Sequence, residues 1–135
     1  MNNLTIPAER DRLDQVQAFI DQNLAGVEYS PEAQIQLQIA VEELFVNIAS
    51  YAYAPGHGDA VIGCRVEEDP PSITVQLRDW GKPFDPLAKK DADVTLSAED
   101  RDIGGLGIYM VKNSMDAVDY KREDGQNVLT IRKNL

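Results

Sequence analysis

Cysteine is nearly absent from this sequence of 135 residues. The single copy, Cys64, cannot form a disulfide within the chain, and it excludes a zinc site built from several cysteines. No run of about 20 apolar residues is present, so we expect no membrane-spanning segment and no membrane partner. The first residues also lack the basic and then apolar pattern of a secretory signal. Together these absences predict a cytoplasmic protein.

Positive charge is also scarce. Lysine and arginine number 13 against 23 aspartates and glutamates, which gives a net charge of −10. This balance argues against nucleic acid as a partner, because no basic face is available to neutralise phosphates. A ligand that carries phosphate groups must then be bound by local donors or through a metal ion, since the overall field of the protein repels it.

The length and the apolar content of 43% fit one globular domain over residues 1–135. Hydrophobic periodicity predicts helices over residues 8–25, 31–53 and 105–115. It predicts strands over residues 3–6, 60–68, 72–79, 117–122 and 127–133, the last two joined by an Asp-Gly turn. The stretch 86–103 has no pattern and is either a lid or disordered. We expect an α/β two-layer sandwich, with helices on one face of a mixed, mainly antiparallel sheet.

The second predicted helix carries two polar residues beside its apolar stripe. That stripe consists of Leu37, Val41, Leu44 and Ile48. Glu43 and Asn47 stand four residues apart and stack along its flank. A carboxylate and an amide in this arrangement can hold a metal ion, or a water molecule and a metal ion. An exposed polar pair at the edge of the core has the same spacing, so both interpretations stay open.

A charged residue continues the apolar face of the third predicted strand. Ile73, Val75 and Leu77 share one face by alternation, and Asp79 is in phase with them. A buried charge requires a partner, so this carboxylate could accept a hydrogen bond from a ligand's amino group in a pocket above the sheet. Alternatively, it caps the turn at Gly81 or reaches water at the end of the strand.

Three glycines in four positions lead into an apolar helical segment in RDIGGLGIYMV, residues 101–111. A glycine within a helix costs roughly 1 kcal/mol relative to alanine, so a helix alone does not explain Gly104, Gly105 and Gly107. Glycines just before a helix leave its first N–H groups open to an anion, and the helix dipole adds partial positive charge. A sharp turn is the simpler alternative, although it usually needs only one or two glycines.

Taken in order, these motifs resemble those of the Bergerat-fold ATPases, the superfamily of gyrase B, MutL and the catalytic domains of histidine kinases. VEELFVN resembles the helix motif of the superfamily, DWGKPFDP its first glycine box and GGLGIYMV its second. Within the superfamily, the chain is most similar to the bacterial anti-sigma factor serine kinases. The resemblance implies a Bergerat ATP-binding fold, ATP and Mg²⁺ as ligands, and serine kinase activity.

The resemblance also implies roles for individual residues. Glu43 would be the general base that activates a serine hydroxyl on a partner protein, and Asn47 would coordinate Mg²⁺ between the ATP phosphates. The other implied nucleotide-binding residues are Asp79, Gly81 and Thr130 near adenine, and Gly104, Gly105 and Gly107 at the phosphates. The implied partners are an anti-sigma factor antagonist of the STAS fold, a sigma factor and a second copy of the kinase in a homodimer.

Two positions depart from the family pattern. Relatives often carry an arginine immediately before the second glycine box, where this chain has Ile103 and places Arg101 two residues earlier. The terminal G-T-x-V is GQNV here, with Gln126 in place of the threonine. An ATP-binding module that sequesters a partner, with little or no kinase activity, is therefore the alternative to a kinase. A relative that no longer binds nucleotide is the third possibility.

Overall fold

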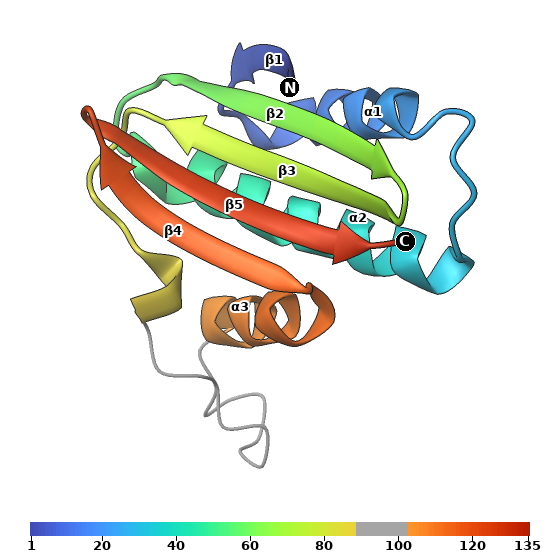
Figure 1. The fold of residues 1–135 in the computed structure, drawn as a ribbon. Coiled ribbons are helices and arrows are strands. Elements are labelled where there is room, and N and C mark those ends of the chain that lie inside the picture. The colour runs from blue at the N-terminus through green and yellow to red at the C-terminus, as the bar shows by residue number, and fades with distance from the viewer. Residues whose placement is uncertain (89–102) are drawn as a thin grey trace.

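The computed structural model describes residues 1–88 and 103–135 of the chain. In this part the strands form one sheet in the spatial order β1-β2-β3-β5-β4 (Figure 1). The strands are β1 (Asn2–Pro7), β2 (Asp59–Glu68), β3 (Pro71–Asp79), β4 (Ala117–Glu123) and β5 (Gln126–Asn134). Every neighbouring pair is antiparallel, so the sheet is antiparallel throughout and not mixed.

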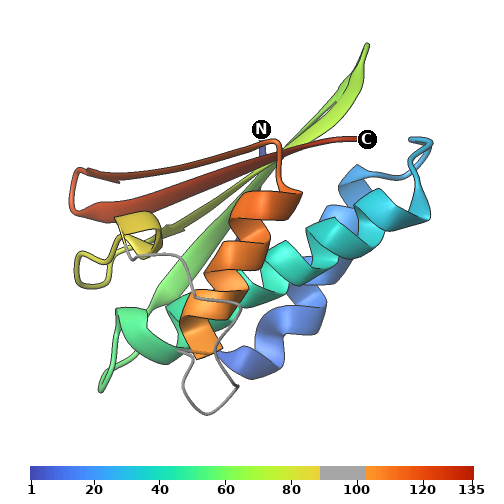
Figure 2. The same cartoon turned by 90° about the horizontal axis from the view of Figure 1, so that it is seen from below.

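The described helices cover one face of this sheet, as Figure 2 shows. They are α1 (Leu13–Asn23), α2 (Pro31–Asn47) and α3 (Ile103–Ser114). The shorter helical turns are η1 (Arg10–Arg12), η2 (Ile48–Ala52) and η3 (Pro86–Ala88). Helix α2 lies between α1 and α3 and packs against both (Figure 2). This arrangement confirms the predicted α/β two-layer sandwich.

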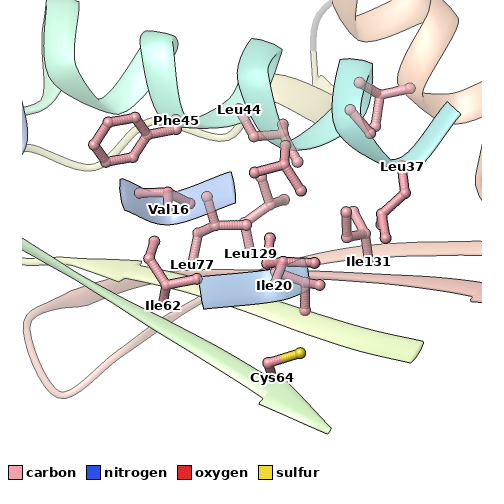
Figure 3. Close-up of a cluster of buried hydrophobic side chains, with 14 of the residues drawn as sticks. Val16, Ile20, Leu37, Leu44, Phe45, Ile62, Cys64, Leu77, Leu129 and Ile131 are labelled. Atoms are coloured by element: carbon pink, nitrogen blue, oxygen red, sulfur yellow. The ribbon is translucent and has the colours of Figure 1, made fainter. Parts of the chain in front are cut away.

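The core lies between the helices and the inner face of the sheet (Figure 3). Alternation along the central strands directs Ile62, Leu77 and Ile131 toward the helices, where they face side chains such as Leu44 of α2. Each of these four side chains is at most 1% exposed. Cys64 belongs to the same layer, and burial raises the pKa of its thiol to about 11. The thiol therefore stays protonated at neutral pH and packs as a small apolar group.

Helix α2 begins as the sequence predicts and ends in a modified turn. The hydroxyl of Ser30 accepts a hydrogen bond from the N–H of Ala33 (3.0 Å), and Pro31 occupies the first helical position. After Asn47 the chain continues through η2, a wider π-type turn. The helical path therefore ends next to Tyr53, close to its predicted end.

The other two helices start at different residues from those predicted. The helix expected from residue 8 begins as η1 and becomes α-helical only at Leu13. Helix α3 begins at Ile103, two residues before its predicted start. Asp124 (φ 53°) and Gly125 (φ 76°) form the predicted turn between β4 and β5, since this turn needs positive φ angles. Among residues 1–88 and 103–135, no helix has the length and apolar character needed to cross a membrane.

Truncation of a core isoleucine tests this packing. Ile73→Ala should lower the free energy of unfolding by about 2–5 kcal/mol, because its side chain is fully buried and its removal leaves a cavity. Ile35→Ala is the matched control, since Ile35 is 55% exposed on α2 and its truncation should change stability by less than about 0.5 kcal/mol. Urea unfolding followed by circular dichroism measures both variants, and equal losses would contradict the described core.

Candidate active site

A pocket lies on the helix-facing side of the sheet, between the end of α2 and the adjoining ends of β3 and β5. Its walls are largely apolar or aromatic and include Leu44, Ile48, Tyr51, Leu77, Phe84 and Leu129. Four further lining residues bring polar groups to it: Asn47, Asp79, Tyr120 and Asn127. An apolar cleft with a few converging polar groups is the typical form of a small-molecule site.

The carboxylate of Asp79 is the most deeply buried charge of this pocket. Asp79 ends β3 and is only 3% exposed, as its phase with the apolar residues of the strand predicts. Its Oδ1 accepts hydrogen bonds from the N–H of Gly81 (2.9 Å) and from the side-chain amide of Asn127 (2.9 Å). Its Oδ2 has no hydrogen-bond partner among the described residues. The carboxylate therefore caps the turn at Gly81 and still has one oxygen available to a ligand.

Gly81 has a steric role beside Ala52, which lines the pocket. A Cβ at this position would overlap the backbone of Ala52 in η2. The carbonyl oxygen of Ala52 also accepts a hydrogen bond from the N–H of Lys82 (3.0 Å). The loop after β3 thus packs directly on the turn after α2, and this close approach requires glycine.

Asn127 is a pocket residue that the sequence did not reveal. It lies directly opposite Asp79 in the ladder between β3 and β5. Its side-chain NH₂ group donates to Asp79 Oδ1 and to the carbonyl oxygen of Lys82, each at 2.9 Å. The terminal family motif points to Gln126 instead. Because side chains alternate along a strand, however, Asn127 lies on the same side of β5 as Leu129, which faces the pocket.

The amide oxygen of Asn127 accepts hydrogen bonds from residues of β4 and of the loop after β3. It accepts hydrogen bonds from the hydroxyl of Tyr120 (2.5 Å), from Arg122 Nη1 (3.2 Å) and from the N–H of Phe84 (3.3 Å). Arg122 Nη1 also donates to the carbonyl oxygen of Gly81 (2.8 Å). One asparagine thereby ties β4 and the loop after β3 to the buried carboxylate.

Glu43 and Asn47 lie on the flank of α2, near α3. Asn47 lines the pocket, whereas the Glu43 carboxylate lies against Gly107 of α3. Burial raises the pKa of Glu43 above its ordinary value of 4.5, and the negative charge of the neighbouring Glu42 raises it further. Both side chains are therefore partly buried, and the alternative of an exposed polar pair at the edge of the core does not describe them.

The three glycines lie in two successive turns of α3. Because the helix begins at Ile103, Gly104 and Gly105 lie in its first turn, where the N–H groups have no acceptor within the helix. These N–H groups can bind an anion. Gly107 lies one turn further along, where a Cβ would overlap the carboxyl group of Glu43.

Thr130, which the resemblance places near adenine, lies on the opposite face of the sheet from the pocket. Thr130 lies between Leu129 and Ile131 and therefore on the face of the sheet away from the helices. There its hydroxyl accepts a hydrogen bond from the side-chain amide of Gln76 (3.5 Å). Arg101 and most of the stretch 86–103 lie outside the described residues.

The order and geometry of these elements agree with a comparison to known proteins. The profile of the family described as histidine kinase-like ATPase domain matches residues 6–133. The chain belongs to this family. The predicted resemblance to the Bergerat-fold ATPases is thereby confirmed, and membership implies ATP binding.

Curated relatives of similar length are named as protein kinases. The chain is 29% identical over 103 residues to the serine/threonine-protein kinase BtrW of Bordetella bronchiseptica, covering 76% of this chain and 72% of BtrW. It is 28% identical to the serine-protein kinase RsbW of Listeria monocytogenes, covering 93% and 82% of the two chains. For the serine-protein kinase RsbW of Halalkalibacterium halodurans the identity is 27%, with coverages of 90% and 76%. These similarities support protein kinase activity.

Asn127→Asp tests the polar contacts around the buried carboxylate. The substitution keeps the shape of the side chain, removes the donors to Asp79 and Lys82, and places a second carboxylate beside the first. We expect the free energy of unfolding at pH 7 to fall by about 3 kcal/mol, measured by urea unfolding. Asn3→Asp, on the exposed edge strand β1, is the matched control and should change it by less than about 0.5 kcal/mol. Similar values for the two variants would contradict the described role of Asn127.

Proposed function

We propose that this protein is an ATP-dependent protein-serine kinase that phosphorylates an anti-sigma factor antagonist of the STAS fold and also binds a sigma factor, acting as a homodimer in the cytoplasm. The observation that carries the proposal is the pocket between α2 and the sheet, where the buried Asp79 has one oxygen that no described residue engages. Glu43 on α2, one turn before the pocket residue Asn47, lies against Gly107 of α3. The similarity to BtrW and RsbW supports the same conclusion.

Adenine would occupy the apolar part of the pocket. Asp79 Oδ2 would accept a hydrogen bond from its amino group, because Oδ1 is already engaged by Gly81 and Asn127. The side chains of Leu44 and Leu129, on opposite layers of the sandwich, would contact the faces of the ring. This arrangement selects adenine over guanine, since guanine presents a carbonyl oxygen where adenine has its amino group.

The phosphates would extend from the pocket toward α3, where the N–H groups of Gly104 and Gly105 have no acceptor within the helix. Asn47 would offer its amide oxygen to Mg²⁺, which would neutralise charge on the phosphates when bound. The described residues contain no cluster of three or more His, Cys, Asp or Glu side chains suited to a metal ion. This donor set fits Mg²⁺, which proteins commonly hold through one or two side chains together with substrate phosphates.

Glu43 would act as the general base toward the serine of the partner. The serine oxygen forms a bond to the γ-phosphorus, the bond from that phosphorus to the bridging oxygen of ADP breaks, and the serine proton passes to Glu43. A raised pKa suits this role, because a carboxylate with higher proton affinity is a stronger base in its ionised form. Most of the rate would come from positioning and charge stabilisation.

A second candidate function is partner sequestration with ATP as a structural ligand. The feature that favours it is Ile103 at the start of α3, where many relatives carry an arginine directed at the phosphates. The two functions share the adenine pocket but differ in phosphoryl transfer. ATP binding without transfer to any candidate antagonist would support the second function.

Glu43→Gln separates transfer from binding. Labelled ATP, Mg²⁺ and the STAS-type antagonist should give a labelled antagonist with the parent protein, and the variant should lose this transfer while its ATP affinity stays within about twofold. The raised pKa of Glu43 also means that folding takes up protons, so the parent loses stability as pH rises above 4.5. Urea unfolding between pH 4 and pH 7 should therefore show the variant gaining relative to the parent. Transfer that survives the substitution would exclude Glu43 as the base.

Asp79→Asn tests adenine recognition by titration calorimetry. We expect ATP affinity to fall about 10- to 100-fold, because a hydrogen bond to a charged acceptor is replaced by an amide that can present a donor. Asp119→Asn is the matched control, since Asp119 is exposed on β4 and its substitution should leave ATP affinity unchanged. Unchanged affinity in Asp79→Asn would place adenine elsewhere on the protein.

A further inference from the structure

Three polar side chains form a row across the sheet at the pocket. Asp79 of β3 lies directly opposite Asn127 of β5, and Asn127 lies directly opposite Arg122 of β4. These three strands adjoin one another in the sheet (Figure 1). Residues that lie opposite each other share a face of the sheet, so all three side chains lie on the helix-facing side. The row therefore places a carboxylate, an amide and a guanidinium next to one another.

One nitrogen atom of Arg122 connects the two residues that hold the buried carboxylate. Arg122 Nη1 donates to Asn127 Oδ1 (3.2 Å) and to the carbonyl oxygen of Gly81 (2.8 Å). Asn127 and Gly81 are also the residues that donate to Asp79 Oδ1, each at 2.9 Å. Arg122 thus contacts both of the residues that fix this oxygen.

The orientation of the Asn127 amide depends on what its neighbours can donate or accept. A guanidinium can only donate, so Arg122 requires the amide oxygen on its own side. The NH₂ group then faces Asp79 and the carbonyl oxygen of Lys82, to which it donates. The opposite orientation would bring the amide oxygen against the Asp79 carboxylate. Arg122 therefore favours the orientation in which Asn127 stabilises the buried negative charge.

The partners of Arg122 differ from those of its neighbour in β4. With a net charge of −10, the protein offers an exposed arginine many carboxylates. Lys121, on the other face of β4, forms such a surface ion pair with Glu123 (3.0 Å). Arg122 donates instead to two uncharged oxygens, and both belong to residues that contact Asp79. Surface pairing does not explain this arrangement, whereas a role at the pocket does.

We propose that Arg122 is a positioning residue for adenine recognition, which acts through Gly81 and Asn127 and not by contact with the nucleotide. This inference rests on the proposed function, in which Asp79 Oδ2 accepts a hydrogen bond from the adenine amino group. Arg122 holds both donors to Asp79 Oδ1, so that this oxygen stays engaged and Oδ2 stays available to adenine. The structural part of the inference, that Arg122 holds Asn127, does not depend on any ligand.

A nucleotide without the amino group tests the part that concerns adenine. Purine riboside triphosphate is ATP without its 6-amino group, so the ratio of the two affinities measures the hydrogen bond to Asp79. In titration calorimetry, the parent should bind ATP about 10- to 100-fold more tightly than this analogue. Arg122→Met should lower the ratio by about threefold or more. Equal losses of both affinities, with the ratio unchanged, would show a merely structural role and overturn the proposal.

Two further variants separate the hydrogen bonds of Arg122 from its charge. Lys121→Met makes the same change in net charge, so it has the same long-range effect on a triphosphate, and it should leave the ratio unchanged. Arg122→Lys should retain more of the ratio than Arg122→Met, because both hydrogen bonds come from a single nitrogen that an ammonium group can replace. A ratio that falls equally in Lys121→Met, or equally in Arg122→Lys and Arg122→Met, would contradict the proposal. If Arg122→Met does not fold, Arg122→Gln takes its place, since it removes the charge and keeps a polar end.

The side-chain amide of Asn127 tests the structural part without nucleotide. In a proton–nitrogen correlation spectrum, its NH₂ signals are identified by their absence in Asn127→Ser. In Arg122→Met these signals should shift and exchange with solvent about tenfold faster, whereas Lys121→Met should leave them unchanged. Equal signals in the parent and Arg122→Met would overturn the structural part. If the parent binds ATP and its analogue equally well, the proposed adenine site fails, and this spectrum still decides whether Arg122 holds Asn127.

Discussion

The pocket depends on the burial of one carboxylate. Asp79 follows the apolar phase of β3 into the space beneath α2, and a charge at that depth is tolerated only when hydrogen-bond donors reach it. The donors come from Gly81 and Asn127, so the turn after β3 and the start of β5 are both tied to the same oxygen. Asn127 then orients Tyr120 and Arg122 of β4. The shape of the pocket thus follows from the hydrogen bonds that the buried Asp79 carboxylate requires.

Local patterns predicted the features that depend on neighbouring residues in the chain. Alternation along β3 put Asp79 in phase with the buried residues of the strand but left open whether its carboxylate reaches water, and Ser30 with Pro31 marked the start of α2. Asn127 was missed because its importance depends on the register between β3 and β5, which pairs residues 48 positions apart. The contact between Gly107 and Glu43 was missed for the same reason, since two strands of the sheet, β2 and β3, separate the two helices in the chain.

An acidic protein that binds a triphosphate needs positively charged or N–H donor groups close to the phosphates. The pocket is lined by no lysine or arginine within the described residues, and Arg122, which contacts the lining residue Asn127, donates hydrogen bonds to Asn127 and to Gly81. The first turn of α3 contributes partial positive charge through N–H groups that have no acceptor within the helix, and a magnesium ion at Asn47 would contribute most of the rest. With a net charge of −10, free nucleotide is repelled at long range, so the affinity would come from short-range contacts.

Helix α3 would contact both the phosphates of ATP and the proposed base Glu43. Its first turn would meet the phosphates through Gly104 and Gly105, and its second turn meets the proposed base through Gly107. A rise of 1.5 Å per residue sets these two contacts about 3–5 Å apart along one rigid axis. Any shift of the helix that improves the fit to the phosphates therefore also moves the surface on which Glu43 rests. The spacing of the three glycines would in this way couple nucleotide binding to the position of the base.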